Sequence, residues 1–229
     1  MIILSLDTSS AAGSVALVSD GAILDERAGD ASRTHGERLP AELMSLLEQH
    51  RIAPHAIDLF AVAIGPGSFT GLRVGIATIQ GLALANGRLV APVSTFEALA
   101  WRARGSDDPI ATWIDAHRGE VFASLFTPDG QTMITPPSAM PPREILEAWS
   151  ESVGNARRVR FAGDGAVRYR VEIERVLGKR ALIDTASAPL AGAIGEIAHE
   201  QPSRAVRPHA IVPLYVRRPD AELARDRRR

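Results

Sequence analysis

Apolar runs of strand length recur along the chain, and turn residues separate them. Five runs have the length and composition of buried strands: residues 2–6, 59–64, 90–93, 110–114 and 159–162. Three segments alternate between apolar and polar positions, as half-buried strands do: residues 14–18, 22–24 and 120–126. Asp20-Gly21 is a hairpin turn signal between the first two of these segments. The pattern predicts a β-meander over the first 30 residues and a similar hairpin around residue 120.

Helical patterns fill most of the intervals between these strands. They predict five helices, at residues 35–50, 70–86, 95–104, 141–149 and 188–200. Thr34 and Glu37 have the spacing of a capping box at the start of the first helix. Gly87 stands just past the end of the second helix, where glycine is favoured. Pro40 either lies in the first regular turn of its helix or kinks it.

The order of elements is repeated in the two halves of the chain. Each half reads as strand, carboxylate, hairpin, helix, strand and helix, which predicts two related α/β lobes. The stretch from Arg104 to Pro109 has the composition of a linker. We therefore expect an N-terminal lobe at 1–104, a C-terminal lobe at 105–216 and a charged, flexible tail at 217–229. The C-terminal helix can cross back onto the first lobe.

The composition indicates a soluble globular protein and excludes sites that need cysteine. The 229 residues are 45% hydrophobic and 23% charged, as in soluble globular proteins. Cysteine is absent, which excludes disulfides, zinc–thiolate sites and a cysteine nucleophile. No signal peptide and no stretch long enough to span a bilayer are visible, so we expect a cytoplasmic protein that does not bind membranes.

Charge is unevenly distributed along the chain. Residues 1–154 hold 10 basic and 18 acidic side chains, whereas residues 155–229 hold 16 basic and 9 acidic ones. The basic end either meets RNA or an acidic partner, or forms a solvated surface that ends in an arginine-rich tail.

The segment Gly65-Pro66-Gly67-Ser68-Phe69-Thr70-Gly71-Leu72-Arg73 is the most informative in the chain. It joins a predicted strand to a predicted helix, where backbone N–H groups can hold a phosphate. The alternative is a tight turn without a ligand, since the spacing fits neither a Walker A loop nor a dinucleotide fingerprint. Arg73 falls in the first helical turn, where the helix dipole disfavours a cation by ~0.3–1 kcal/mol. A phosphate, or a carboxylate across an interface, would offset that cost; otherwise Arg73 is simply an exposed side chain.

The helix at 70–86 is apolar nearly all round. Ala77, Gly81 and Ala85 form a stripe of small residues along it. One face can lie on the sheet. The other is expected to meet either another helix of this chain or another protein.

Two carboxylates end equivalent strands of the two halves. Asp7 ends the first strand and Asp115 the matching one, so together they could hold a magnesium–phosphate group in a cleft between the lobes. However, Ala116, His117 and Arg118 follow Asp115, where a phosphate hairpin needs glycine. No histidine pair has metal-ligand spacing, and Ser68 has no signature of a nucleophile.

These residues resemble a known family. The chain is similar to the TsaB family, also called YeaZ, at residues 4–9, at the segment 65–73, at residues 93–100 and at Pro213-Leu214-Tyr215-Val216-Arg217 with Ala221. The resemblance covers the whole chain. It implies a two-lobed fold of the actin/Hsp70/sugar-kinase type, with a mixed sheet and flanking helices in each lobe. It also implies a bacterial complex that forms N6-threonylcarbamoyladenosine at position 37 of tRNAs that read ANN codons.

The resemblance assigns roles to subunits and to residues. It implies that the transfer is catalysed by a paralogue, TsaD, that TsaB is its non-catalytic partner or forms a homodimer, and that an ATPase, TsaE, joins them. The paralogue has a metal-binding His-x-x-x-His where this chain has Thr95 to Leu99. No cofactor is then expected in this chain, ATP and the metal belong to its partners, and tRNA is reached through the complex.

Two sets of site residues follow from this reading. The expected partner interface comprises Leu39, Leu43, Leu46, Phe69, Leu72, Arg73, Ile76, Ala77, Gly81 and Ala85. The residues of a vestigial phosphate site would be Asp7, Thr8, Ser9, Gly65, Gly67, Ser68 and Asp115. Two other functions remain as alternatives: an autonomous ATP-dependent kinase or ATPase of the same fold, and a peptidase.

Overall fold

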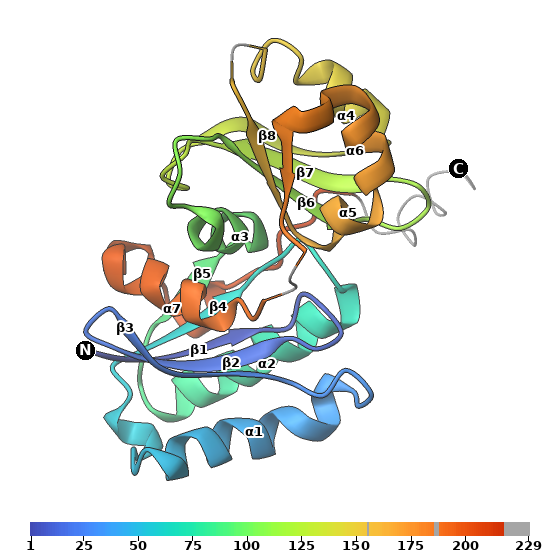
Figure 1. The fold of residues 1–229 in the computed structure, drawn as a ribbon. Helices are drawn as coiled ribbons and strands as arrows, with labels where there is room; N and C mark the ends of the chain where they lie inside the picture. Colours follow the sequence, from blue (N-terminus) through green and yellow to red (C-terminus); the bar gives the residue numbers. More distant parts are fainter. Residues whose placement is uncertain (155, 186–187, 218–229) are drawn as a thin grey trace.

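A computed structural model describes residues 1–154, 156–185 and 188–217. It contains two five-stranded mixed sheets (Figure 1). The first has the order β3-β2-β1-β4-β5 and the second the order β10-β9-β6-β7-β8. In each sheet three consecutive strands form an antiparallel meander, and two later strands join it in parallel. The repeated order of elements read from the sequence is therefore a repeated topology.

The first sheet is built from the apolar runs of the N-terminal half. Its strands are β1 (Ile2–Asp7), β2 (Ser14–Ser19), β3 (Ala22–Ala28), β4 (Leu59–Ala63) and β5 (Val90–Val93). The predicted hairpin turn is confirmed, because Asp20 and Gly21 both have positive φ, at 48° and 83°. β3 continues beyond the predicted 22–24 to Ala28.

Helices cover both faces of the first sheet (Figure 1). α1 (His35–Gln49) and α2 (Phe69–Ala85) pack on one face, where the core includes Leu39, Leu43 and Leu46 of α1. α3 (Thr95–Ala103) and α7 (Ala191–Glu200) pack on the other face. Pro40 lies inside α1. The Glu37 carboxylate accepts hydrogen bonds from the N–H and the hydroxyl of Thr34 at the start of that helix.

α7 returns from the end of the second lobe to the first sheet. The Ser5 hydroxyl donates to the carbonyl of Ala191 at 2.6 Å, and the Ser14 hydroxyl accepts the N–H of Ala191 at 3.0 Å. The N–H of Gly192 donates to the Glu26 carboxylate at 2.6 Å. These contacts join segments about 170–190 residues apart in sequence, and α7 contributes to the core of the first lobe.

The second sheet repeats the plan with shorter helices. Its strands are β6 (Ile110–Asp115), β7 (Val121–Phe126), β8 (Met133–Met140), β9 (Val159–Ala162) and β10 (Ala181–Ile183). Its helices are α4 (Pro142–Ala148), α5 (Asp164–Arg168) and α6 (Arg170–Leu177). The core of this lobe centres on Trp113, whose ring meets Trp149 and Phe161 edge-on.

Four elements of the second lobe are absent from the sequence prediction. β8 contains Pro136 and Pro137, and it lies at an edge of the sheet, where a missing N–H is tolerated. β10 is a three-residue edge strand, too short to give a periodic signal. α5 and α6 are short and meet at Tyr169. In the part of the chain that the structure describes, no helix is long and apolar enough to cross a membrane.

Candidate functional site

A cavity of about 480 Å³ lies between the two lobes. Residues of the β1–β2 loop, of α3, of the ends of β6 and β9 and of the segment before α7 line it. Its polar lining comprises Asp7, Ser9, Ser10, Thr95, Arg102, Arg160, Asp164, Asp184 and Thr185. Its apolar lining includes Leu99, Ala103, Ile114, Ala162 and Leu190. Of the predicted phosphate-site residues, only Asp7 and Ser9 belong to this lining.

Asp7 is the buried carboxyl group of the cavity. Its side chain accepts the N–H of Ser9 at 2.8 Å, and the residue is 3% exposed. Burial raises the pKa of Asp7, because desolvation disfavours the carboxylate more than the Ser9 hydrogen bond stabilises it.

Asp115 does not line the cavity, contrary to the prediction. It forms an ion pair with Arg168 at 3.5 Å, lies 3.4 Å from Nδ1 of His117, and accepts the backbone N–H of His117. These partners, one of which lies on α5, hold the carboxylate within its own lobe. His117 and Arg118 in the following turn have positive φ, at 58° and 57°, so side chains occupy the positions where glycine would leave room for a phosphate.

The glycine-rich turn packs directly on the loop after β1. The N–H of Ser68 donates to the carbonyl of Ser9 at 2.7 Å, and the Ser68 hydroxyl accepts the N–H of Gly71. A side chain at Gly67 would overlap the Ser9 backbone, and one at Gly71 would overlap the carbonyl of Thr8. The glycines therefore let the start of α2 pack directly on the loop after β1. This packing accounts for the glycines of the turn.

Thr8 and Gly65 are used in the same packing. A side chain at Gly75, one turn further along α2, would overlap the Thr8 hydroxyl, which is buried and has no hydrogen-bond partner. The carbonyl of Gly65 accepts the N–H of Thr95 at 2.8 Å. The contacts between β1, α2 and α3 are thus made by Thr8, Gly65, Gly67 and Ser68. These residues do not line the cavity.

Thr95 and Leu99 stand on the cavity side of α3. They occupy the positions at which the resemblance places two histidine ligands in the transferase paralogue. Thr95 Oγ1 is buried without a hydrogen-bond partner, and the Leu99 side chain has no donor atom for a metal. The residues present do not fit a metal ion. Within the described residues, no group of three or more His, Asp or Glu side chains could hold one.

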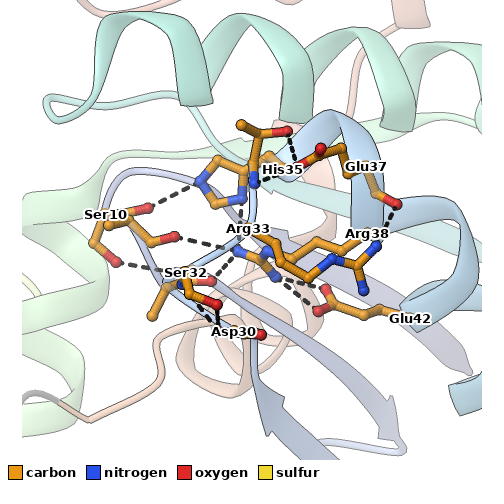
Figure 2. A network of polar contacts seen from close by, with 12 residues as sticks. Ser10, Asp30, Ser32, Arg33, His35, Glu37, Arg38 and Glu42 are labelled. Carbon is orange, nitrogen blue, oxygen red and sulfur yellow. Dashed lines mark hydrogen bonds and ion pairs between the residues drawn. The ribbon is translucent and has the colours of Figure 1, made fainter.

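A buried polar network holds the β1–β2 loop against α1 (Figure 2). His35 Nε2 lies 2.9 Å from the carbonyl oxygen of Ser10, and Arg38 donates to His35 Nδ1 at 2.8 Å. Arg38, which is 2% exposed, also donates to the carbonyl of Ala12 and to Glu42. Desolvation lowers the pKa of His35, and neighbouring Arg38 adds to the effect. Helical spacing alone places His35 and Arg38 on α1 and gives no sign that they reach the loop.

One face of α2 is exposed to solvent. Ala77, Gly81 and Ala85, the stripe of small residues, all lie on it, and Gly81 has no neighbouring atom where a side chain would begin. Leu84 is 74% exposed and Phe69 is 44% exposed. We call this surface, together with Arg73, the α2 face. The small-residue stripe is therefore exposed to solvent and is not covered by another helix of the described chain.

Five residues predicted for the partner interface lie instead in the core. They are Leu39, Leu43, Leu46, Leu72 and Ile76, each at most 4% exposed. The three leucines of α1 and Ile76 of α2 pack between the helices and the first sheet. Leu72 packs with the core of the opposite face. Helical spacing identifies apolar positions correctly, but it does not separate those that face the sheet from those that face solvent.

The chain is similar to proteins of one family over nearly its full length. Residues 28–183 match the family model described as "TsaD: tRNA N6-adenosine threonylcarbamoyltransferase". The tRNA threonylcarbamoyladenosine biosynthesis protein TsaB of Bacillus subtilis is 30% identical over 226 residues, which are 97% of this chain and 96% of that protein.

Solved structures agree with the sequence relatives. YeaZ from Pseudomonas aeruginosa matches with a TM-score of 0.77 and 30% identity, over 93% of this chain and 99% of that one. A dehydratase activator from Clostridium difficile matches with a TM-score of 0.53 at 10% identity, over 89% and 96% of the two chains, and shares only the fold. The architecture is the two-lobed actin/Hsp70/sugar-kinase type. The chain belongs to the TsaB (YeaZ) family and takes part in the biosynthesis of threonylcarbamoyladenosine in tRNA.

Proposed function

We propose that this chain is a non-catalytic subunit that binds a TsaD-like transferase through the α2 face and thereby activates it. The transferase moves threonylcarbamoyl to N6 of adenosine 37 in tRNAs that read ANN codons. A TsaE-like ATPase joins the complex in the cytoplasm, and tRNA meets the chain only within that complex. A second copy of the chain is an alternative occupant of the same face.

The exposed apolar α2 face is the observation that carries this proposal. One side of this 17-residue helix is exposed to solvent and carries Phe69, Ala77, Gly81, Leu84 and Ala85. Phe69 contacts the exposed ring of Tyr215. Contiguous exposed apolar surface of this kind marks sites of protein association. Small residues at i, i+4 and i+8 also allow the backbone of a second helix to approach closely.

The state of the interlobe site supports a non-catalytic role. Asp7 is buried with a raised pKa, Asp115 is paired with Arg168, and the N–H groups of Ser68 and Gly71 in the glycine turn bond within the chain. Leu99 offers no electron pair to a metal. Residues that would hold ATP phosphates or a metal are thus either engaged elsewhere or replaced, so neither is assigned to this chain.

A reconstituted transfer assay tests the division of labour. Purified chain, purified TsaD-like transferase and their mixture are each supplied with threonylcarbamoyl-adenylate, the ATPase and tRNA. We expect measurable formation of threonylcarbamoyladenosine only in the mixture. Turnover by this chain alone would contradict the proposal and would direct attention back to Asp7 and the cavity.

A matched pair of substitutions tests the surface. Leu84→Arg places a charge on the α2 face, and Val171→Arg places one on α6, where valine is 64% exposed. Because both side chains point to solvent, both variants should keep the stability of the wild type within about 0.5 kcal/mol. Leu84→Arg should abolish binding to the transferase in titration calorimetry, and Val171→Arg should not. Equal affinities for the two variants would show that α2 is not the contact surface.

A further inference from the structure

Arg73, Phe69 and Tyr215 form an exposed cluster where α2 begins. The Arg73 guanidinium lies over the Phe69 ring, with its carbon 3.9 Å from the ring centroid. Its Nε–H donates to the Tyr215 hydroxyl at 3.2 Å. The two aromatic rings are 5.6 Å apart, and Tyr215 is 40% exposed. Stacking and a hydrogen bond thus fix the plane of a guanidinium on an open surface.

Among the described residues, this cation has no partner of opposite charge. α2 contains no acidic residue, and no carboxylate in the part of the chain that the structure describes lies within ion-pair distance of Arg73. Arg73 is the fifth residue of α2, because the helix begins at Phe69 rather than at the predicted residue 70, so it lies just beyond the first turn. Since Nε is already used, the two terminal NH₂ groups are the free donors. They have the spacing that binds both oxygens of a carboxylate.

We infer that Arg73 is the polar anchor of the α2 face and that it binds a carboxylate side chain of the transferase. The inference rests on the proposed function and adds the chemistry that selects the partner. Aromatic residues and arginine are the types that dominate binding energy in protein interfaces. A guanidinium already held in place loses little side-chain entropy when it binds, which favours this arrangement further.

The cluster favours a protein carboxylate over an RNA phosphate. Arg73 continues an apolar stripe of α2, which a folded protein can bury and a phosphodiester backbone cannot. The guanidinium itself covers one face of the Phe69 ring, so that face is not available for a base to stack on.

The cluster also favours a different protein over a second copy of this chain. Two copies packed through their α2 helices bring two Arg73 residues into the interface and no α2 carboxylate to meet them. A buried cation without a partner is costly. A transferase that presents a carboxylate removes this cost, so Arg73 sets a preference for the mixed complex.

The test compares the Arg73→Gln, Arg73→Lys and Leu84→Arg variants of the full chain, with Arg175→Gln on α6 as the control. Affinity for purified transferase is measured by titration calorimetry at two salt concentrations, and self-association by sedimentation equilibrium. Arg73→Gln should weaken transferase binding at least tenfold and reduce its salt dependence. It should leave self-association unchanged or stronger. Arg73→Lys should be intermediate, because lysine cannot bind the tyrosine and a carboxylate fork together.

Each contrary result separates the inference from the proposed function. If Arg73→Gln binds the transferase normally and Leu84→Arg does not, the carboxylate anchor is wrong and the α2 face stands. If neither variant loses affinity, the proposed surface itself is wrong. Weaker tRNA binding with unchanged transferase affinity would assign Arg73 to a phosphate and overturn the inference. A chain ending at Arg217 tests the carboxylates of residues 218–229. If Arg73→Gln no longer weakens transferase binding in this shorter chain, the carboxylate that binds Arg73 belongs to residues 218–229, and the inference is overturned.

Discussion

Asp7 and His35 lie at the two sides of the β1–β2 loop, and burial drives both toward their neutral forms. Desolvation raises the pKa of Asp7 and lowers the pKa of His35. His35 therefore donates from Nε2 to the Ser10 carbonyl and accepts from Arg38 at Nδ1, which is the pattern of a neutral ring. The β1–β2 loop is thus held to α1 by hydrogen bonds of His35 that require the neutral ring.

This arrangement predicts a stability that falls in weak acid. Because the pKa of His35 is below its ordinary value of 6.5 in the folded protein, the unfolded chain binds the proton more readily. The His35 contribution to stability is thus complete above pH 6.5 and declines as the pH falls below that value. His35→Gln keeps an N–H donor for the Ser10 carbonyl and cannot be protonated.

Urea unfolding at pH 7.5 and pH 5.5 tests this linkage. The wild type should lose more unfolding free energy between the two values than His35→Gln does, since all other titrating groups are common to both proteins. Equal losses would show that protonation of His35 is not linked to unfolding.

At the scale of elements, α2 shows how one helix serves two purposes. Gly75 packs against Thr8 so tightly that a side chain would overlap the threonine hydroxyl, whereas Gly81 faces open space. Both glycines lower helix propensity by ~1 kcal/mol relative to alanine. Gly75 is therefore required by the packing of α2 on the first sheet, and Gly81 is not required by the fold of this chain.

The pair Gly75→Ala and Gly81→Ala should change stability in opposite directions. Gly81→Ala should raise the free energy of unfolding by ~1 kcal/mol through helix propensity. Gly75→Ala should lower it by ~1–3 kcal/mol, because the added methyl forces α2 away from Thr8. Chemical unfolding of both variants measures the difference. A destabilised Gly81→Ala would mean that the α2 face packs within the protein after all.

The sequence predicts most elements of the first lobe and fewer of the second, for identifiable reasons. Long periodic segments such as α1 and α2 give strong signals, whereas β8 carries two prolines and β10 has three residues. The buried and exposed sides of α2 were beyond prediction, because they depend on Thr8 and Ser9, some 60 residues away. Asp115 was misplaced for a similar reason, since its partner Arg168 comes from α5.

At the scale of the whole molecule, the cavity and the α2 face are separated by the first sheet. The cavity lies between the sheets, beside α3 and the segment before α7. α2 covers the face of the first sheet opposite to α3 and α7 (Figure 1). Substitutions in the cavity can therefore be made without altering the α2 face. If the chain acts only as an activating subunit, substitutions in the cavity should leave its effect on the transferase intact.

The double variant Asp7→Asn/Thr95→Val tests this separation. The asparagine amide keeps an acceptor for the Ser9 N–H and cannot ionise, and the valine removes a hydroxyl that has no partner. Both changes preserve volume, so the fold should be retained and its stability at neutral pH should not decrease. In the reconstituted transfer assay the double variant should support tRNA modification within about threefold of the wild type, a change in barrier of less than about 1 kcal/mol. Leu84→Arg should support none. If the double variant loses activity while its unfolding curve and its affinity for the transferase stay normal, the cavity binds a ligand that the reaction needs, and the chain takes a direct part in the chemistry.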